Sequence, residues 1–143
     1  MVEKDETETG IRATLNFGHT LGHLIETHAG YGKYLHGEAV GVGMFFAAFV
    51  SWRCNELVED DWTRIKSYLS QILTPIKLPP LDQNIFREMI LHDKKSQKHS
   101  VNFIMLRKLG ESFIRKGTSV EMLWNEFKEF VEIFPEFVEI ERR

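Results

Sequence analysis

Apolar residues recur with a helical period along most of the chain, and their spacing predicts five helices. The first helix is expected over about 11–30 and the second over 36–57. Phenylalanines make the later half of the second helix apolar almost all round, which is typical of a helix buried in the centre of a domain. Three further helices are expected over 60–73, 82–91 and 120–133.

Residues that favour helix ends and turns lie between these segments. Asp60 or Asp61 is expected to cap the third helix, Asp82 the fourth and Ser119 the last, because their side-chain oxygens accept from the free N–H groups of a first turn. The proline-rich segment 74–80 is expected to be a linker, since paired prolines stop helices.

Two short apolar runs around a glycine predict a β-hairpin with strands over 101–106 and 112–115. The predicted fold class is therefore mainly α with a small β-hairpin. Residues 1–10 are charged and rich in threonine, and they are expected to form an N-terminal arm or the ragged end of a longer polypeptide. The helical domain is expected to span 11–133, while the pattern does not place the tail 134–143.

Composition and charge narrow the class of protein. With 143 residues there is room for one domain, and an apolar fraction of 43% argues against disorder. A net charge of -3 gives no general attraction to nucleic acid. The single Cys54 excludes an internal disulfide and fits a reducing cytosol. The longest apolar run, 39–50, is too short to span a bilayer and no signal peptide is visible, so a cytoplasmic protein is expected.

Four polar side chains at helical spacing give the first indication of chemistry. Arg12, Asn16, His19 and His23 are four, three and four residues apart, which places them on one face of a helix. A third imidazole, His36, begins the next apolar segment. Such a set can bind a metal ion together with an anionic ligand that is rich in oxygen.

The histidine pair alone is a weak signal. His19 and His23 have the spacing of two metal-binding histidines on one helix, but such pairs are more often surface or core histidines. Thr20 stands where a zinc protease would carry glutamate. The glycines at 18 and 22 leave room beside both imidazoles, which favours a ligand.

Charged residues near the histidines have two interpretations each. Glu26 and Glu38 are either ligands or partners of histidines, or they face solvent. Glu8 lies one turn before the arginine of the cluster and is at least a candidate for an ion pair with it. Lys94 and Lys95 are either solvated or available to a phosphate group.

The histidine-containing strings over 12–26 and 35–44 together resemble the 3-dehydroquinate synthase family. The loop at 93–95 and the hairpin after it are similar to the downstream pattern of that family, so the resemblance covers about 2–123. It implies the C-terminal helical domain of an enzyme that converts 3-deoxy-arabino-heptulosonate 7-phosphate to 3-dehydroquinate and phosphate in the shikimate pathway.

The resemblance also implies a role for each site residue. His19 and His36 would be zinc ligands, and Glu8 and His23 would be the acid and base residues. Zinc would polarise the alcohol that is oxidised and later the carbonyl.

Substrate and cofactor follow from the same resemblance. Arg12 and Asn16 would bind the carboxylate and phosphate ends of the substrate, and Lys94 or Lys95 would contact phosphate. NAD would carry the hydride in the complete enzyme, which would be a homodimer without a nucleic-acid or membrane partner.

The family pattern is only partly present. Members are much longer, and their N-terminal half holds the NAD-binding domain and supplies a glutamate as third zinc ligand; this sequence shows no dinucleotide-binding fingerprint. Residues 98–100 also depart from the family, which usually has glycine there. We therefore expect a fragment that is inactive alone and does not bind NAD. The alternatives are another sugar-phosphate cyclase, the helical domain of an iron-type alcohol dehydrogenase, or a non-catalytic helical module.

Overall fold

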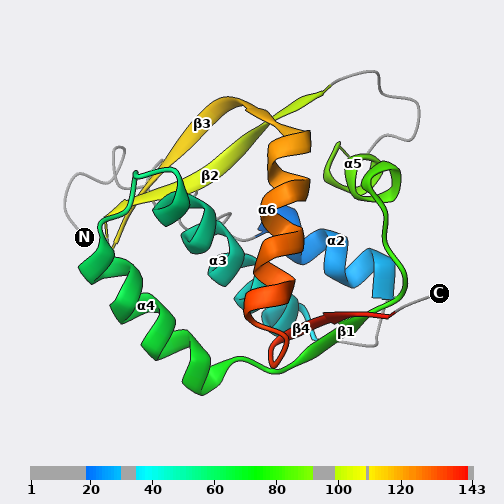
Figure 1. The fold of residues 1–143 in the computed structure, drawn as a ribbon, viewed down its shortest axis with the longest axis horizontal. Coiled ribbons are helices and arrows are strands. Elements are labelled where there is room, and N and C mark those ends of the chain that lie inside the picture. Colours follow the sequence, from blue (N-terminus) through cyan, green and yellow to red (C-terminus); the bar gives the residue numbers. More distant parts are fainter. Residues whose placement is uncertain (1–18, 30–34, 92–98, 109, 142–143) are drawn as a thin grey trace.

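Helices make up most of the part of the chain that the structure describes, as predicted (Figure 1). The structure is a computed structural model that describes residues 19–29, 35–91, 99–108 and 110–141. Its elements are, in order, α2 (His19–Ala29), α3 (His36–Arg53), α4 (Glu59–Ile72), β1 (Ile76–Leu78), α5 (Gln83–Leu91), β2 (Ser100–Lys108), β3 (Glu111–Ser119), α6 (Val120–Ile133) and β4 (Val138–Ile140).

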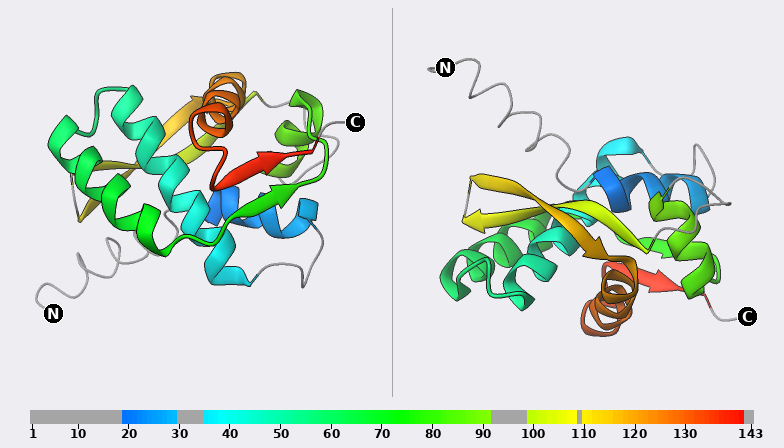
Figure 2. Two further views of the ribbon diagram at one scale, coloured as in Figure 1. Left: turned by 60° about the horizontal axis from the view of Figure 1, so that its bottom comes forward. Right: turned by 90° about the horizontal axis from the view of Figure 1, so that it is seen from above.

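Helix α3 is the centre of the fold, which confirms the prediction of a buried helix. It contacts α2, α4, α6 and β2. Figures 1 and 2 show α2 and α6 on opposite sides of the molecule, while the hairpin β2–β3 crosses one end. From Phe45 to Ser51 every side chain of α3 is buried, so this stretch has no solvent-facing side.

Aromatic rings fill the space between α3 and α6. The ring of Phe46 meets those of Phe127 and Phe130 edge to face, with centroids 5.4 Å apart in both pairs. On the neighbouring side Phe45 stacks on Trp62 of α4 at 5.6 Å. These offset and edge geometries are the favourable ones for aromatic pairs, so they stabilise the core beyond simple burial.

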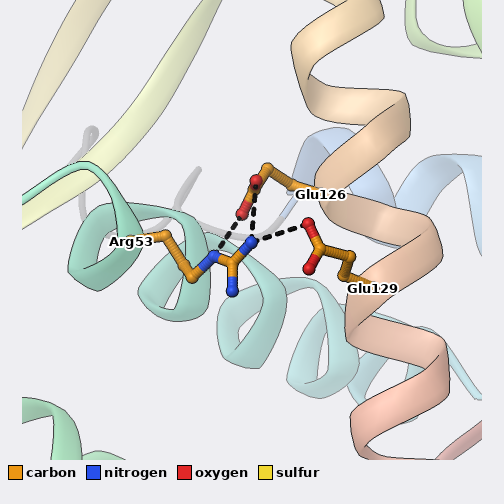
Figure 3. A network of polar contacts seen from close by, with 3 residues as sticks. All are labelled: Arg53, Glu126 and Glu129. Atoms are coloured by element: carbon orange, nitrogen blue, oxygen red, sulfur yellow. Dashed lines mark hydrogen bonds and ion pairs between the residues drawn. The ribbon is translucent and has the colours of Figure 1, made fainter.

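An ion-pair network closes the C-terminal end of α3 against α6 (Figure 3). Nε of Arg53 donates to Oε1 of Glu126 at 3.0 Å, and one terminal nitrogen reaches Oε2 of Glu129 at 2.6 Å. The guanidinium also lies 5.3 Å from the ring centroid of Phe49. Because the arginine fork binds two carboxylates in one geometry, it fixes the angle between the two helices better than a single charge would.

Two of the predicted helix caps are confirmed. The Ser119 hydroxyl accepts from the N–H of Met122 at 3.1 Å at the start of α6. The Asp82 carboxylate accepts from the N–H of Ile85 at 2.8 Å at the start of α5.

The predicted cap of α4 is wrong. Val58 occupies the cap position without a side-chain hydrogen bond, and Asp60 and Asp61 lie in the first turn instead. Their charge still favours this end of the helix through its dipole.

The second helix ends four residues earlier than predicted. Asn55 takes a left-handed φ of 63° just after α3, a conformation that asparagine tolerates better than most residues. The N–H groups of Glu56 and Leu57 then bond the carbonyl of Ser51, which closes the helix end. A single left-handed asparagine does not interrupt the hydrophobic period, so the pattern predicts a helix that continues to Leu57.

The predicted linker contains a strand, and the unplaced tail supplies its partner. β1 pairs in parallel with β4, with Ile76 opposite Val138. Both side chains are buried, as is Leu78. Three-residue strands are too short to show a period, and these two lie far apart in sequence, so the hydrophobic pattern could not reveal the pairing.

The predicted hairpin is confirmed, although its strands are longer than expected. β2 and β3 pair antiparallel from Ser100 and Ser119 inward, and Gly117 takes a positive φ of 67° within β3. Residues 114–117 of β3 are all exposed, so this part of the strand lacks the alternation that identifies strands. The hydroxyl of Ser51 accepts from the N–H of Leu106 at 2.9 Å and ties the hairpin to α3.

Helices α2 and α3 approach closely at a glycine. A Cβ atom added to Gly22 would lie 3.1 Å from the Cα of Val40, which is tighter than ordinary packing. By contrast, a Cβ atom on Gly37 would meet nothing within 4 Å. Gly22 therefore allows α2 and α3 to pack closely, in addition to the room for a ligand that the sequence suggested.

We expect Gly22→Ala to lower the free energy of unfolding by about 1 kcal/mol. Overpacking by the added methyl group costs about 1–3 kcal/mol, which exceeds the gain of about 1 kcal/mol from the higher helix propensity of alanine. Gly37→Ala is the matched control and should raise stability by up to about 1 kcal/mol, since it gains propensity in open space. Urea unfolding measures both values. Equal stabilisation by the two alanines would show that α2 and α3 do not meet at Gly22.

Candidate functional site

Most of the predicted site lies outside the described residues. Glu8, Arg12, Asn16, Lys94 and Lys95 belong to this group, and so does the predicted arm 1–10. The backbone of His19 is described as the first residue of α2, but its side chain is not. The geometry of the site is therefore argued from His23, His36 and the residues around them.

Helix α2 presents a polar face next to a buried one. Leu24 and Ile25 are fully buried in the core. His23 is exposed, and Glu26 follows it by three residues, with His19 one turn before. Residues three apart share a face, so His23 and Glu26 lie along one stripe of α2.

The described structure brings His36 together with Glu26. Nδ1 of His36 lies 2.8 Å from Oε1 of Glu26, and the two side chains are 63% and 20% exposed. Glu26 is thus the partner of a histidine, one of the two interpretations of the sequence. Since an ionised carboxylate only accepts hydrogen bonds, the neutral imidazole carries its proton on Nδ1 and its lone pair on Nε2.

Glu38 has a different role. Its Oε1 accepts from the N–H of Leu35 at 2.8 Å at the start of α3. The carboxylate therefore closes the N-terminal end of the helix, and its negative charge is favourable there.

The side chain of His28 links α2 to a segment that is distant in sequence. Its Nε2 lies 3.1 Å from the carbonyl oxygen of Pro79 and 3.0 Å from that of Pro80. These contacts fix the last turn of α2 to the segment that leads into α5. The sequence places His28 near the end of the first helix, but it gives no signal for these contacts, because the two carbonyls lie 51 and 52 residues further along the chain.

The donor set fits a metal ion only in part. His36 has the arrangement of a metal-binding histidine, in which one ring nitrogen bonds a carboxylate and the other is directed to the metal. Across the described ranges, however, there is no group of three side chains that could hold a metal. Burial raises the pKa of the Cys54 thiol, so this half-buried residue is protonated at neutral pH and is a poor ligand or nucleophile.

None of the described helices combines the length and the apolar character needed to cross a membrane.

Comparison of sequences relates the chain to one family of enzymes. Residues 1–96 match the family described as 3-dehydroquinate synthase C-terminal. The chain is 44% identical over 110 residues to the 3-dehydroquinate synthase of Geobacter metallireducens, covering 77% of this chain and 31% of that one. It is 45% identical over 123 residues to the 3-dehydroquinate synthase of Psychrobacter cryohalolentis, covering 86% and 33%. The chain thus spans about a third of the length of these relatives.

Solved structures share the fold. A 2-deoxy-scyllo-inosose synthase complexed with carbaglucose-6-phosphate, NAD+ and Co2+ superposes with a TM-score of 0.63 at 27% identity, covering 85% of this chain and 36% of that one. The 2-epi-5-epi-valiolone synthase of Streptomyces hygroscopicus, with NAD+ and Zn2+ bound, gives a TM-score of 0.62 at 19% identity, covering 83% and 33%.

We expect His28 and His36 to differ in their effect on stability. His28→Ala should lower the free energy of unfolding by about 1–2 kcal/mol, because it leaves two part-buried carbonyls without their donor. His36→Ala should change it by less than about 0.5 kcal/mol, since that side chain is mostly exposed. Urea unfolding measures both, and the reverse order would show that His36 is kept for stability.

Proposed function

The chain belongs to the 3-dehydroquinate synthase C-terminal family, and we propose that it is the metal- and substrate-binding domain of a 3-dehydroquinate synthase. Its reaction would be the conversion of 3-deoxy-arabino-heptulosonate 7-phosphate to 3-dehydroquinate and phosphate, in the shikimate pathway. The identity of 44–45% to enzymes of that name supports this substrate. The complete protein would be a cytoplasmic homodimer.

The contact between His36 and Glu26 is the observation that carries the proposal. A mostly exposed imidazole held by a carboxylate at 2.8 Å contributes little to the core, yet it has the pattern of a metal ligand. The same carboxylate lies on the face of α2 that bears His23.

We propose that His19 and His36 hold a divalent metal ion, with zinc as the expected species and a third ligand from outside this sequence. When bound, the ion would polarise an alcohol and later a carbonyl oxygen of the substrate. The metal ions named in related structures, Co2+ and Zn2+, support a divalent ion. The neutral Nδ1-protonated form of His36 presents the lone pair of Nε2, which is the form that binds a metal.

His23 is proposed to move protons rather than to bind the metal. It is exposed on the same stripe of α2, one turn from His19, so its imidazole can exchange protons with substrate and solvent. Glu8 is proposed to act with it.

Substrate anions would be bound by the residues that precede α2 and follow α5. Arg12 and Asn16 are proposed to bind the carboxylate and phosphate ends, and Lys94 or Lys95 the phosphate. Guanidinium and ammonium groups form charge-assisted hydrogen bonds with these oxygens. NAD would be bound by a domain outside this sequence, as the NAD+ in the related cyclases supports.

A second candidate is a cyclase that acts on another sugar phosphate. The superposition on 2-deoxy-scyllo-inosose synthase at 27% identity favours a shared cyclase fold, but not a particular substrate. The complete enzyme, assayed on heptulosonate phosphate and on glucose 6-phosphate in parallel, separates the two. Turnover of the second substrate alone would exclude the first proposal.

We expect the 143-residue chain by itself to show neither turnover nor measurable binding of NAD by calorimetry. The reason is that hydride transfer needs a dinucleotide site, and this sequence lacks the glycine-rich fingerprint of one. Detectable NAD affinity of the isolated chain would contradict the proposal that NAD is bound by a domain outside this sequence.

We expect replacement of the three histidines to separate metal binding from proton transfer in the complete enzyme. His23→Ala should lower turnover about a hundredfold or more and leave the zinc content near that of the wild type, as for a lost acid or base. His19→Ala and His36→Ala should lose zinc as well as activity. Zinc content is measured by atomic absorption. The assignment is wrong if His23→Ala empties the site but keeps full turnover per bound metal.

A further inference from the structure

We propose that Glu26 is a positioning residue, which sets the ring orientation and the tautomer of His36. This inference rests on the proposed function, since it concerns how His36 is prepared for a metal ion. It adds a residue that binds neither metal nor substrate directly.

The two partners differ in how firmly they are held. Glu26 extends from α2, whose Leu24 and Ile25 are fully buried and whose Gly22 lies against Val40 of α3. Its side chain is only 20% exposed. The packing of α2 therefore holds the Glu26 carboxylate in place at the surface of the core.

His36 depends more on hydrogen bonding for its orientation. It is the first residue of α3, and at 63% exposure its ring receives little restraint from packing. The contact of 2.8 Å with Glu26 links this ring to the neighbouring helix across ten positions of sequence. We infer from this short contact that Glu26 has a large influence on where the ring of His36 points.

The chemistry of the pair selects one tautomer. A carboxylate accepts but does not donate, so Nδ1 of the neutral imidazole keeps its proton. Nε2 is then unprotonated and can donate its lone pair to a metal ion. Without Glu26, the form protonated on Nε2 competes, and this form has to lose or move a proton before Nε2 can bind a metal.

Glu38 provides a matched control. It is a second carboxylate within two residues of His36, but its Oε1 accepts from the backbone N–H of Leu35. Glu38→Gln keeps an acceptor for this bond and removes one negative charge near His36. Any effect of charge alone should therefore be common to Glu38→Gln and Glu26→Gln.

The first experiment needs no metal. Two-bond 1H–15N NMR spectra of the 143-residue chain report which nitrogen of the neutral His36 ring carries the proton. We expect the Nδ1-protonated form in the wild type and in Glu38→Gln. We expect the Nε2-protonated form to increase strongly in Glu26→Ala and less in Glu26→Gln, whose amide oxygen can still accept. An unchanged tautomer in Glu26→Ala would overturn the proposal.

The second experiment measures zinc affinity of the complete enzyme by competition with a chromophoric chelator. Glu26→Ala should weaken it about 10–100-fold, as found for lost partners of metal-binding histidines. Glu26→Gln should restore part of the loss, and Glu38→Gln should stay near the wild type. Wild-type affinity in Glu26→Ala overturns the positioning role, and so does a loss of affinity without a change of tautomer.

His36→Ala distinguishes this inference from the proposed function. If His36→Ala keeps its zinc, the metal assignment itself is wrong. If His36→Ala loses zinc while Glu26→Ala keeps it, only the role of Glu26 is wrong.

Discussion

The burial of α3 is the constraint on which the other elements depend. Its middle stretch offers no face to water, so it has to be covered by α2, α4, α6 and the hairpin together. Each covering element contributes large apolar side chains, and the aromatic contacts between Phe46 and α6 fix how closely they pack. The N-terminal end of α3, where His36 lies, is placed by this packing although it contributes little to it.

The contact between α2 and α3 places Glu26 against His36. Gly22 meets Val40, and four residues further along α2 Glu26 meets His36, four residues earlier on α3. The two helices therefore run antiparallel, and the first contact sets the distance at which the second can form. A side chain at Gly22 would move α3 by a few tenths of an ångström, which is enough to weaken a hydrogen bond of 2.8 Å.

The sequence predicted those features that repeat along the chain or that depend on one local hydrogen bond. The central helix, the hairpin and the caps at Asp82 and Ser119 are of this kind. It did not predict the pairing of β1 with β4, because two three-residue strands leave no period and meet only through the tertiary fold. For the same reason it could name Glu26 as a possible partner of a histidine, but not which histidine.

The exposure of His36 matters for the chemistry that we propose. An imidazole that is 63% exposed, next to a leucine at 72%, lies at an open edge of the fold. In such a place water competes for a metal ion and screens every charge, whereas cyclisation of a sugar phosphate requires charges to act in a site from which water is excluded. The described core covers most of Glu26, which is 20% exposed, but leaves His36 largely exposed. Under the proposed function, the exclusion of water from His36 would be the task of the rest of the enzyme.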